Sequence, residues 1–162
     1  MSEGTAPSLS PQSAIRNPQS GVGVLLVQLG TPDAPTTPAL RRYLRQFLGD
    51  PRVIEAPRLK WWFILNFFIL PFRPRKSAAK YRRIWDAANG SPLLYYTRRQ
   101  AAALQAALPQ LPVAFGMQIG NPPVAEAVQG LIARGVERLI VLPMYPQYSA
   151  TTTASATDVL FQ

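Results

Sequence analysis

Three short apolar runs constrain the fold of this chain more than any other feature of its sequence. They cover residues 24–29, 113–117 and 139–142. Runs of this length that stay apolar through successive positions are typical of strands buried on both faces, as in parallel sheets. The stretch between the last two runs has the periodicity of a helix, which makes a βαβ unit with a right-handed crossover. We therefore predict an α/β fold on a parallel sheet, doubly wound and Rossmann-like.

Amphipathic helices are predicted between and after these strands. The predicted helices are 40–48, 76–88, 92–108, 124–132 and a last one from Thr152 onward. Ser91 and Asn121 each stand directly before a proline, which is typical of an N-cap followed by proline at the first helical position. Asn89-Gly90 and Gly135 are expected to end the preceding helices.

The domain organisation follows from composition and from the strand count. Residues 1–20 are rich in Ser and Pro and hold no apolar run, so we expect a disordered tail there and a domain over 21–162. The tail also lacks the apolar core of a secretion signal, and the expected location is cytoplasmic. Three strands make an unfinished sheet, and we expect the chain to be a piece whose remainder supplies further strands.

Two absences limit the chemistry. The 162 residues include neither cysteine nor histidine. This excludes disulfides, thiolate metal sites, imidazole bases and imidazole metal ligands in the sequence as given. Gly21 and Gly23 precede the first strand, whereas a dinucleotide fingerprint needs its glycines after the strand, so a Rossmann cofactor site is not supported.

The positive charge is concentrated in one region. The net charge is +9, and eight of the 17 cations lie between Arg58 and Arg83 with no carboxylate among them. Within this region residues 61–70 are apolar except for Asn66. Ten helical residues span about 15 Å, half of a bilayer's hydrocarbon core, so this block cannot cross a membrane. Three alternatives remain open for the block: peripheral membrane contact through residues 58–76, the apolar lip of a ligand cleft, or ordinary burial between helices. The cations are interpreted either as a site for anionic partners or simply as a solvated face.

The loops after the three strands should face one cleft, because ligands of parallel α/β sheets bind beyond the carboxyl ends of the strands. These loops carry Tyr, Thr, Ser, Gln and Met and almost no charge. Such a cleft suits a flat apolar ligand with polar edges. The hydroxyls of residues 149–153 are interpreted either as an anion site or as a helix cap.

Several motifs together give the chain a resemblance to the ferrochelatase family, the terminal enzymes of haem synthesis. In chain order they are QLGTP at 28–32, RPRKSA at 73–78 followed by Tyr81, GSPL at 90–93, GM at 116–117 with GNP at 120–122, and LPMYPQYS at 142–149. The match runs from about residue 22 to the end, and YPQYS followed by TTTAS is its most specific piece.

This resemblance implies two similar α/β domains with a porphyrin cleft between them, and insertion of Fe(II) into protoporphyrin IX. Family members are considerably longer, so the chain resembles the N-terminal half of that two-domain architecture. The family's metal-handling His and Glu lie in the second domain. The resemblance therefore implies no catalytic residue, no metal ligand and no bound cofactor in this chain, with Fe(II) as a substrate handled elsewhere.

The porphyrin-contacting positions of the family correspond to Leu29, Arg73, Tyr81 and Ser91 here, and Tyr148 is added from the loop after the third strand. Leu29 would pack on the ring, and Arg73 would pair with a propionate. Tyr81 and Ser91 would donate hydrogen bonds to carboxylates or line the cleft wall. The alternatives are that Tyr81 belongs only to the apolar stripe of its helix and that Ser91 is only a helix cap.

The sequence departs from the family at Gln118-Ile119, where many members carry Arg-Tyr. The charge contact expected there is lost, and no binding role is carried over to Gln118. A second hypothesis for the whole chain is a non-catalytic module that binds tetrapyrroles or membranes. Nucleic-acid binding ranks last, because no recognition motif accompanies the positive charge.

Overall fold

The computed structural model describes residues 21–161 and confirms the parallel α/β fold. Three strands, β1 (Val22–Thr31), β2 (Val113–Gly120) and β3 (Arg138–Pro143), form one sheet in the order β2-β1-β3. Both pairings are parallel, with Leu26 of β1 opposite Phe115 and Leu142. The predicted tail over 1–20 lies outside the described residues.

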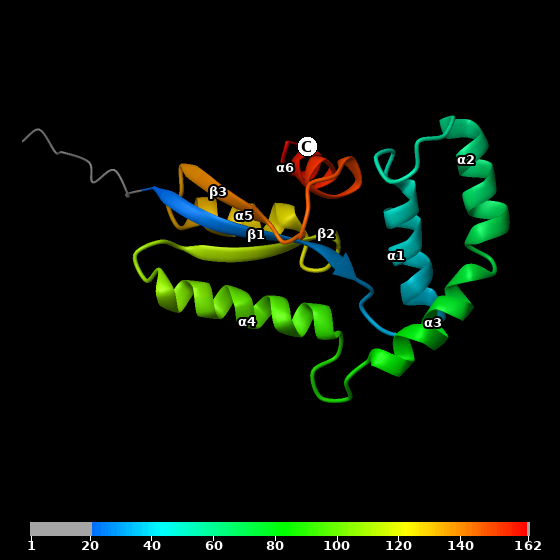
Figure 1. Ribbon diagram of the computed structural model, residues 1–162, viewed down its shortest axis with the longest axis horizontal. Helices are drawn as coiled ribbons and strands as arrows, with labels where there is room; N and C mark the ends of the chain where they lie inside the picture. The colour runs from blue at the N-terminus through cyan, green and yellow to red at the C-terminus, as the bar shows by residue number, and fades with distance from the viewer. Residues whose placement is uncertain (1–20, 162) are drawn as a thin grey trace, which may run out of the picture.

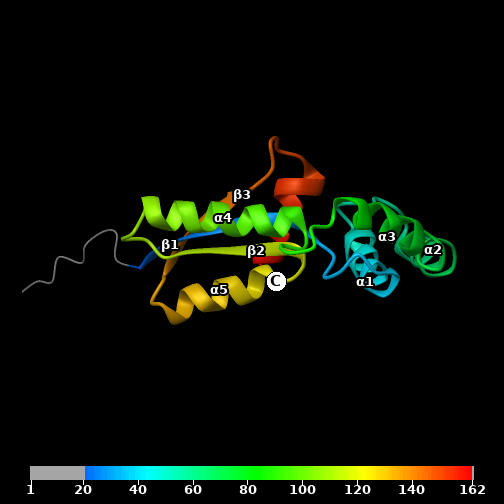
Figure 2. The ribbon, with the colours of Figure 1, turned by 90° about the horizontal axis from the view of Figure 1, so that it is seen from below.

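Helices cover both faces of the sheet. Helix α4 (Pro92–Ala107) lies on one face and α5 (Val124–Ala133) on the other, as the view along the sheet shows (Figure 2). After β3 a π-helical turn, η2 (Ala150–Ala154), leads into α6 (Ser155–Leu160), which packs on α5. Because both faces of β1 are covered, Val24 to Val27 are no more than 3% exposed. This double burial is why the first run is apolar at every one of these positions.

A second group of helices stands beyond the carboxyl ends of the strands (Figure 1). It consists of α1 (Thr37–Gly49), α2 (Arg58–Ile64), the π-helical segment η1 (Leu65–Ile69) and α3 (Arg73–Ile84). The apolar face of α1, through Leu40, Leu44 and Leu48, packs against Leu65 and Ala78 in one buried cluster. The amphipathic pattern predicted for residues 40–48 is confirmed, and the apolar side chains of this pattern hold the helical group together.

The helix predicted over 76–88 is placed wrongly at both ends. Helix α3 begins at Arg73, because Pro74 occupies its first turn, and ends at Ile84. The chain then turns back between Asp86 and Gly90, which exchange two backbone hydrogen bonds. The Asp86 carboxylate accepts hydrogen bonds from the backbone N–H groups of Ala88 and Asn89, and these local bonds compete with helix continuation. They also lower the pKa of Asp86.

The two predicted N-caps have different outcomes. Ser91 occupies the N-cap of α4 as predicted, yet its hydroxyl makes no capping bond and instead contacts Thr31. The cap predicted at Asn121 is wrong, because α5 begins at Val124 with Pro123 at the N-cap. The Asn121-Pro122 peptide bond is cis, and the Asn121 amide donates to the Asp33 carboxylate at 2.7 Å.

Gly30 sets the spacing between β1 and β2 at their carboxyl ends. Its φ is +110°, a conformation that side chains with a Cβ rarely adopt. An added Cβ would lie 1.7 Å from the carbonyl oxygen of Ile119 on β2. Only a glycine therefore lets β1 lie this close to β2 at its carboxyl end.

Replacing this glycine tests that constraint. We expect Gly30→Ala to destabilise the fold by about 3 kcal/mol or more, because backbone strain and overlap with β2 add. Urea unfolding followed by circular dichroism measures the change. The matched control is Gly49→Ala, since no atom lies within 4 Å of a Cβ there. Equal stabilities of the two variants would contradict the proposed role of Gly30.

Candidate functional site

The carboxyl ends of the strands meet at one edge of the sheet. Thr31 lies opposite Gly120, and Val27 lies opposite Pro143. The loops that follow β1, β2 and β3 therefore start side by side, as the parallel pattern predicts. The helices α1 to α3 border the same edge, so the site has to be assembled from these loops and these helices.

Leu29 and Tyr81 share one hydrophobic cluster with Tyr43 of α1. Both pack against the buried cluster that contains Tyr43, and the Tyr43 and Tyr81 ring centroids are 6.4 Å apart in an edge-to-face arrangement. The Tyr43 hydroxyl donates to the carbonyl oxygen of Gly30 at 3.4 Å. Burial, followed by the neighbouring Tyr81, raises the pKa of Tyr43 well above its usual value, so this phenol stays protonated and remains a donor.

Ser91 contacts the last residue of β1. Its hydroxyl and that of Thr31 are 2.8 Å apart, and Ser91 is 4% exposed. It forms part of the wall of a cavity of about 530 Å³ that is also lined by Trp85, Arg98 and Asp33. Of the five predicted site residues, Ser91 alone lines this cavity.

Arg73 and Tyr148 both face solvent. Arg73 is the first residue of α3, and Tyr148, in the loop after β3, is 77% exposed. Within residues 21–161 neither forms a hydrogen bond or an ion pair, although Tyr148 lies near enough to Arg52 to act on it electrostatically. The two side chains are therefore available to a ligand.

Gln118 has a role that the sequence did not reveal. It is 5% exposed and accepts a hydrogen bond from the Tyr145 hydroxyl at 2.6 Å. Its amide nitrogen donates to Ser155 of α6, and the Ser155 hydroxyl donates to the Asp50 carboxylate. A carboxylate can only accept, so the direction of the whole chain of bonds is determined and every member is satisfied. Four separate segments are joined in this way.

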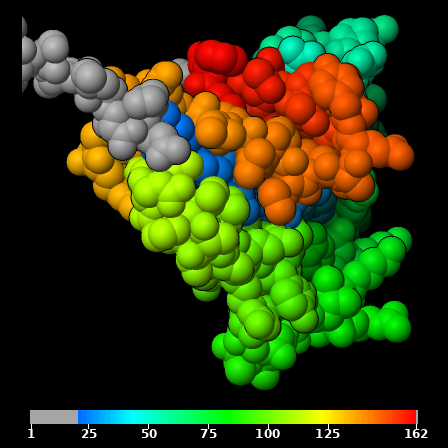
Figure 3. Space-filling model, turned by 60° about the vertical axis from the view of Figure 1, so that its left-hand side comes forward, coloured from blue at the N-terminus to red at the C-terminus, as the bar shows by residue number. Residues whose placement is uncertain are grey.

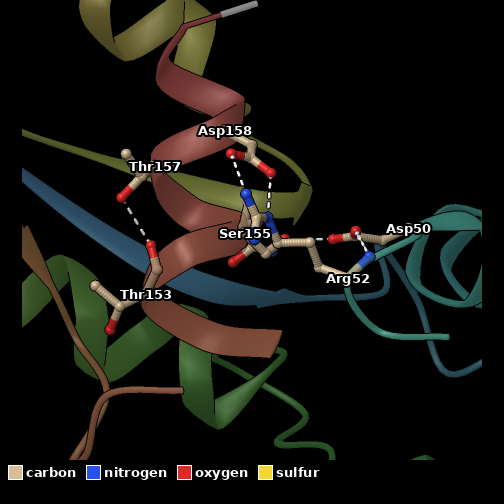
Figure 4. Close-up of polar contacts among 7 residues, drawn as sticks. Asp50, Arg52, Thr153, Ser155, Thr157 and Asp158 are labelled. Carbon is tan, nitrogen blue, oxygen red and sulfur yellow. Dashed lines mark hydrogen bonds and ion pairs between the residues drawn. The ribbon is translucent and has the colours of Figure 1, made fainter. Parts of the chain in front are cut away.

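The same loop after α1 is held to α6 by an ion pair. The Arg52 guanidinium forms two hydrogen bonds with the Asp158 carboxylate, through Nε to Oδ2 and through Nη2 to Oδ1 (Figure 4). These bonds lower the pKa of Asp158 and raise that of Arg52. A cavity of about 270 Å³ lies between this loop and α6, with Gln118 and Ser155 in its wall.

The hydroxyl-rich segment after Tyr148 forms a helix cap. Ser149 is the N-cap of η2, and its side chain and that of Thr152 form a reciprocal capping box. The two hydroxyl oxygens are 2.7 Å apart. The cap interpretation of residues 149–153 is thereby confirmed.

An exposed apolar surface covers α2 and η1, and we call it the apolar lip. Its members are Leu59, Trp62, Phe63, Ile64, Phe67, Phe68 and Phe72, which are 41–81% exposed. Of residues 61–70, only Leu65 and Leu70 are buried, so ordinary burial of this block is the wrong alternative.

In the described part of the chain no helix is long and apolar enough to cross a membrane. Residues 21–161 also contain no group of three or more carboxylates placed to hold a metal ion.

Comparison with known proteins gives a family match over the whole described part of the chain. The family model described as Ferrochelatase matches residues 21–162. A protein named Ferrochelatase from Erwinia tasmaniensis is 54% identical over 144 residues, which are 89% of this chain and 44% of the relative. The Ferrochelatase of Idiomarina loihiensis is 52% identical over 86% of this chain and 39% of its own length. The Ferrochelatase of Nitrosomonas europaea is 50% identical over 93% of this chain and 43% of its own length. The chain thus spans about two fifths of the length of these relatives.

Removing the Gln118 amide tests the buried hydrogen-bond chain. We expect Gln118→Leu to destabilise the fold by about 1–3 kcal/mol, because the Tyr145 hydroxyl and the Ser155 oxygen each lose a buried partner. The free energy of unfolding in urea gives the value. The control is Gln129→Leu on the exposed face of α5, which makes the same chemical change without these bonds. A loss of equal size in both variants would show that the Gln118 bonds contribute nothing.

Proposed function

Because the chain belongs to the ferrochelatase family, we propose that it forms the porphyrin-holding part of an enzyme that inserts Fe(II) into protoporphyrin IX to form haem, a lyase reaction. The observation that carries this proposal is the gathering of three sequence-distant residues at the end of β1. Leu29 and Tyr81 pack on the Tyr43 cluster, and Ser91 is bonded to Thr31. All three are positions that the resemblance assigns to porphyrin contact.

Each predicted residue has a distinct physical role in holding the macrocycle. Leu29 offers an apolar surface to the ring face. Arg73, exposed and free of an ion pair with the described residues, pairs with a propionate through charge-assisted hydrogen bonds. When Thr31 donates to Ser91, the Ser91 hydroxyl proton is left to donate to a second carboxylate oxygen. Tyr81 and Tyr148 supply further phenol donors at the edge of the cleft.

The metal is a substrate in this proposal, and its handling is assigned to residues outside this chain. Without histidine or cysteine, only carboxylates and phenols could bind Fe(II) or remove pyrrole protons. The best-placed carboxylates, Asp50 and Asp158, already accept hydrogen bonds from Ser155 and Arg52. We therefore assign residues 21–162 to an N-terminal chelatase domain that cradles the porphyrin, with a second domain supplying the catalytic groups.

A second proposed role is peripheral membrane contact through residues 58–76, in the cytoplasm. The apolar lip supports it, since exposed Phe and Trp side chains on one helical segment are typical of a surface that enters a lipid interface. Five cations lie within residues 58–76: Arg58, Lys60, Arg73, Arg75 and Lys76. Each contributes about 1 kcal/mol of attraction to an anionic surface. Porphyrin and haem are poorly soluble, and a membrane is a suitable place to exchange them.

Porphyrin titration tests the first proposal. The chain should give a saturable shift of the Soret band with protoporphyrin, and Arg73→Ala should weaken binding about tenfold, since one charge-assisted bond is lost. Arg134→Ala, at the far end of α5, is the matched control and should bind like the parent chain. Absence of saturable binding, or equal weakening by both variants, would refute the assignment of Arg73.

Vesicle sedimentation tests the second proposal. Binding to vesicles with anionic lipid should exceed binding to zwitterionic vesicles and should fall as salt is raised. Phe68→Ser should reduce the bound fraction severalfold, because it removes an exposed apolar side chain from the interface. Thr157→Ser, on the exposed surface of α6, is the control. Salt-insensitive binding that Phe68→Ser leaves unchanged would contradict membrane contact through the lip.

A further inference from the structure

Two apolar hollows lie on either side of Trp62 in the apolar lip. The first, about 410 Å³, opens between the loop after α1 and helix α2, with Ile54, Trp61 and Leu65 in its wall. The second, about 460 Å³, is formed by α2 itself, through Phe63 and Ile64. Leu59 and Trp62 belong to both hollows. Both hollows are shallow and open to solvent.

The first hollow is held open by a fixed wall. The Trp61 indole donates to the carbonyl oxygen of Leu48 at 2.6 Å, which ties the ring to the end of α1. Leu65, at the base, is 5% exposed and belongs to the buried helical cluster. On the outer side, Trp62 packs edge-on against Phe67, with ring centroids 6.1 Å apart. The partition between the two hollows is therefore part of a packed aromatic group and not a single free side chain.

Each hollow has a cation at its rim. Arg58 lines the first and Lys60 lines the second. Neither forms an ion pair with any residue in 21–161. Glu55, three positions before Arg58, is the preceding carboxylate in the sequence, and no carboxylate follows until after Arg83. Two apolar hollows with two unpaired cations at their rims are complementary to an anionic molecule with two apolar tails.

We propose that these hollows form a stoichiometric site for one anionic phospholipid, with one acyl chain in each hollow and the phosphate against Arg58 and Lys60. The inference rests on the proposed membrane contact and deepens it, because it distinguishes a defined site from general adsorption. In this site Trp62 separates the two chains, while Phe67, Phe68 and Phe72 of the lip contact the surrounding lipid.

Short-chain phospholipids, used as monomers below their micelle concentration, test the site without a bilayer. Native mass spectrometry should show one dihexanoyl-phosphatidylglycerol per protein chain, and tryptophan fluorescence should saturate with it. The corresponding phosphatidylcholine should bind about tenfold more weakly, because its headgroup carries no net charge for the two cations. Lengthening each of the two acyl chains by one methylene should tighten binding about fifteenfold, since each of the two buried methylenes favours binding by about fourfold.

Substitutions at the hollows complete the test. Ala56 lines the first hollow, so Ala56→Trp should fill it and weaken monomer binding at least tenfold. Ala103→Trp, on the exposed surface of α4, is the matched control. Arg58→Gln should reduce the preference for phosphatidylglycerol, and it remains informative if Ala56→Trp fails to fold.

Three outcomes would overturn the site: monomer binding that does not saturate at one lipid, no dependence on acyl length, or an unchanged headgroup preference in Arg58→Gln. Any of these, combined with intact binding to anionic vesicles, would reject the defined site and leave the proposed membrane contact standing. Loss of vesicle binding with monomer binding retained would reject the membrane proposal instead.

Discussion

The close contact between β1 and β2 is the constraint on which the remainder of the structure depends. Gly30 brings the end of β1 against the carbonyl oxygen of Ile119, where no other residue would fit. From that point the chain leaves the sheet toward α1, and Tyr43 returns a hydrogen bond to Gly30. The helical group is thereby held beside the strand ends, so that Leu29 and Tyr81 pack on one cluster.

The sheet and the helical group are also joined by buried polar contacts. The chain from Tyr145 through Gln118 and Ser155 to Asp50 links the loop after β3, β2, α6 and the loop after α1. Low local dielectric strengthens such bonds and makes an unpaired member costly, so the network favours one arrangement of the two groups. The apolar lip therefore belongs to the helical group, and these polar bonds fix the position of that group beside the sheet. Figure 3 shows the segment after β3 (orange) at the surface, next to α6 (red).

Sequence reasoning located the elements but not all of their ends or side-chain partners. The parallel strands and the amphipathic helix 40–48 were predictable because burial on one or two faces imposes a period on the residues. The end of the helix predicted over 76–88 was not, because Asp86 bonds to two local backbone groups that leave no periodic signal. Asn121 was misassigned for a related reason: its partner, Asp33, is 88 positions away.

Gln118 shows the limit of prediction from sequence alone. Its difference from the family's usual residue was visible in the sequence, yet its partners come from a loop and a helix that only folding brings to it. By itself the sequence determined the fold class, the absence of imidazole and thiol chemistry, and the concentration of cations around an apolar block, because composition and periodicity are properties of neighbours along the chain. Tertiary structure alone decided that this block is exposed, that Ser91 bonds Thr31 and that Leu29 and Tyr81 pack on the same buried cluster, because each of these depends on which distant segments pack together.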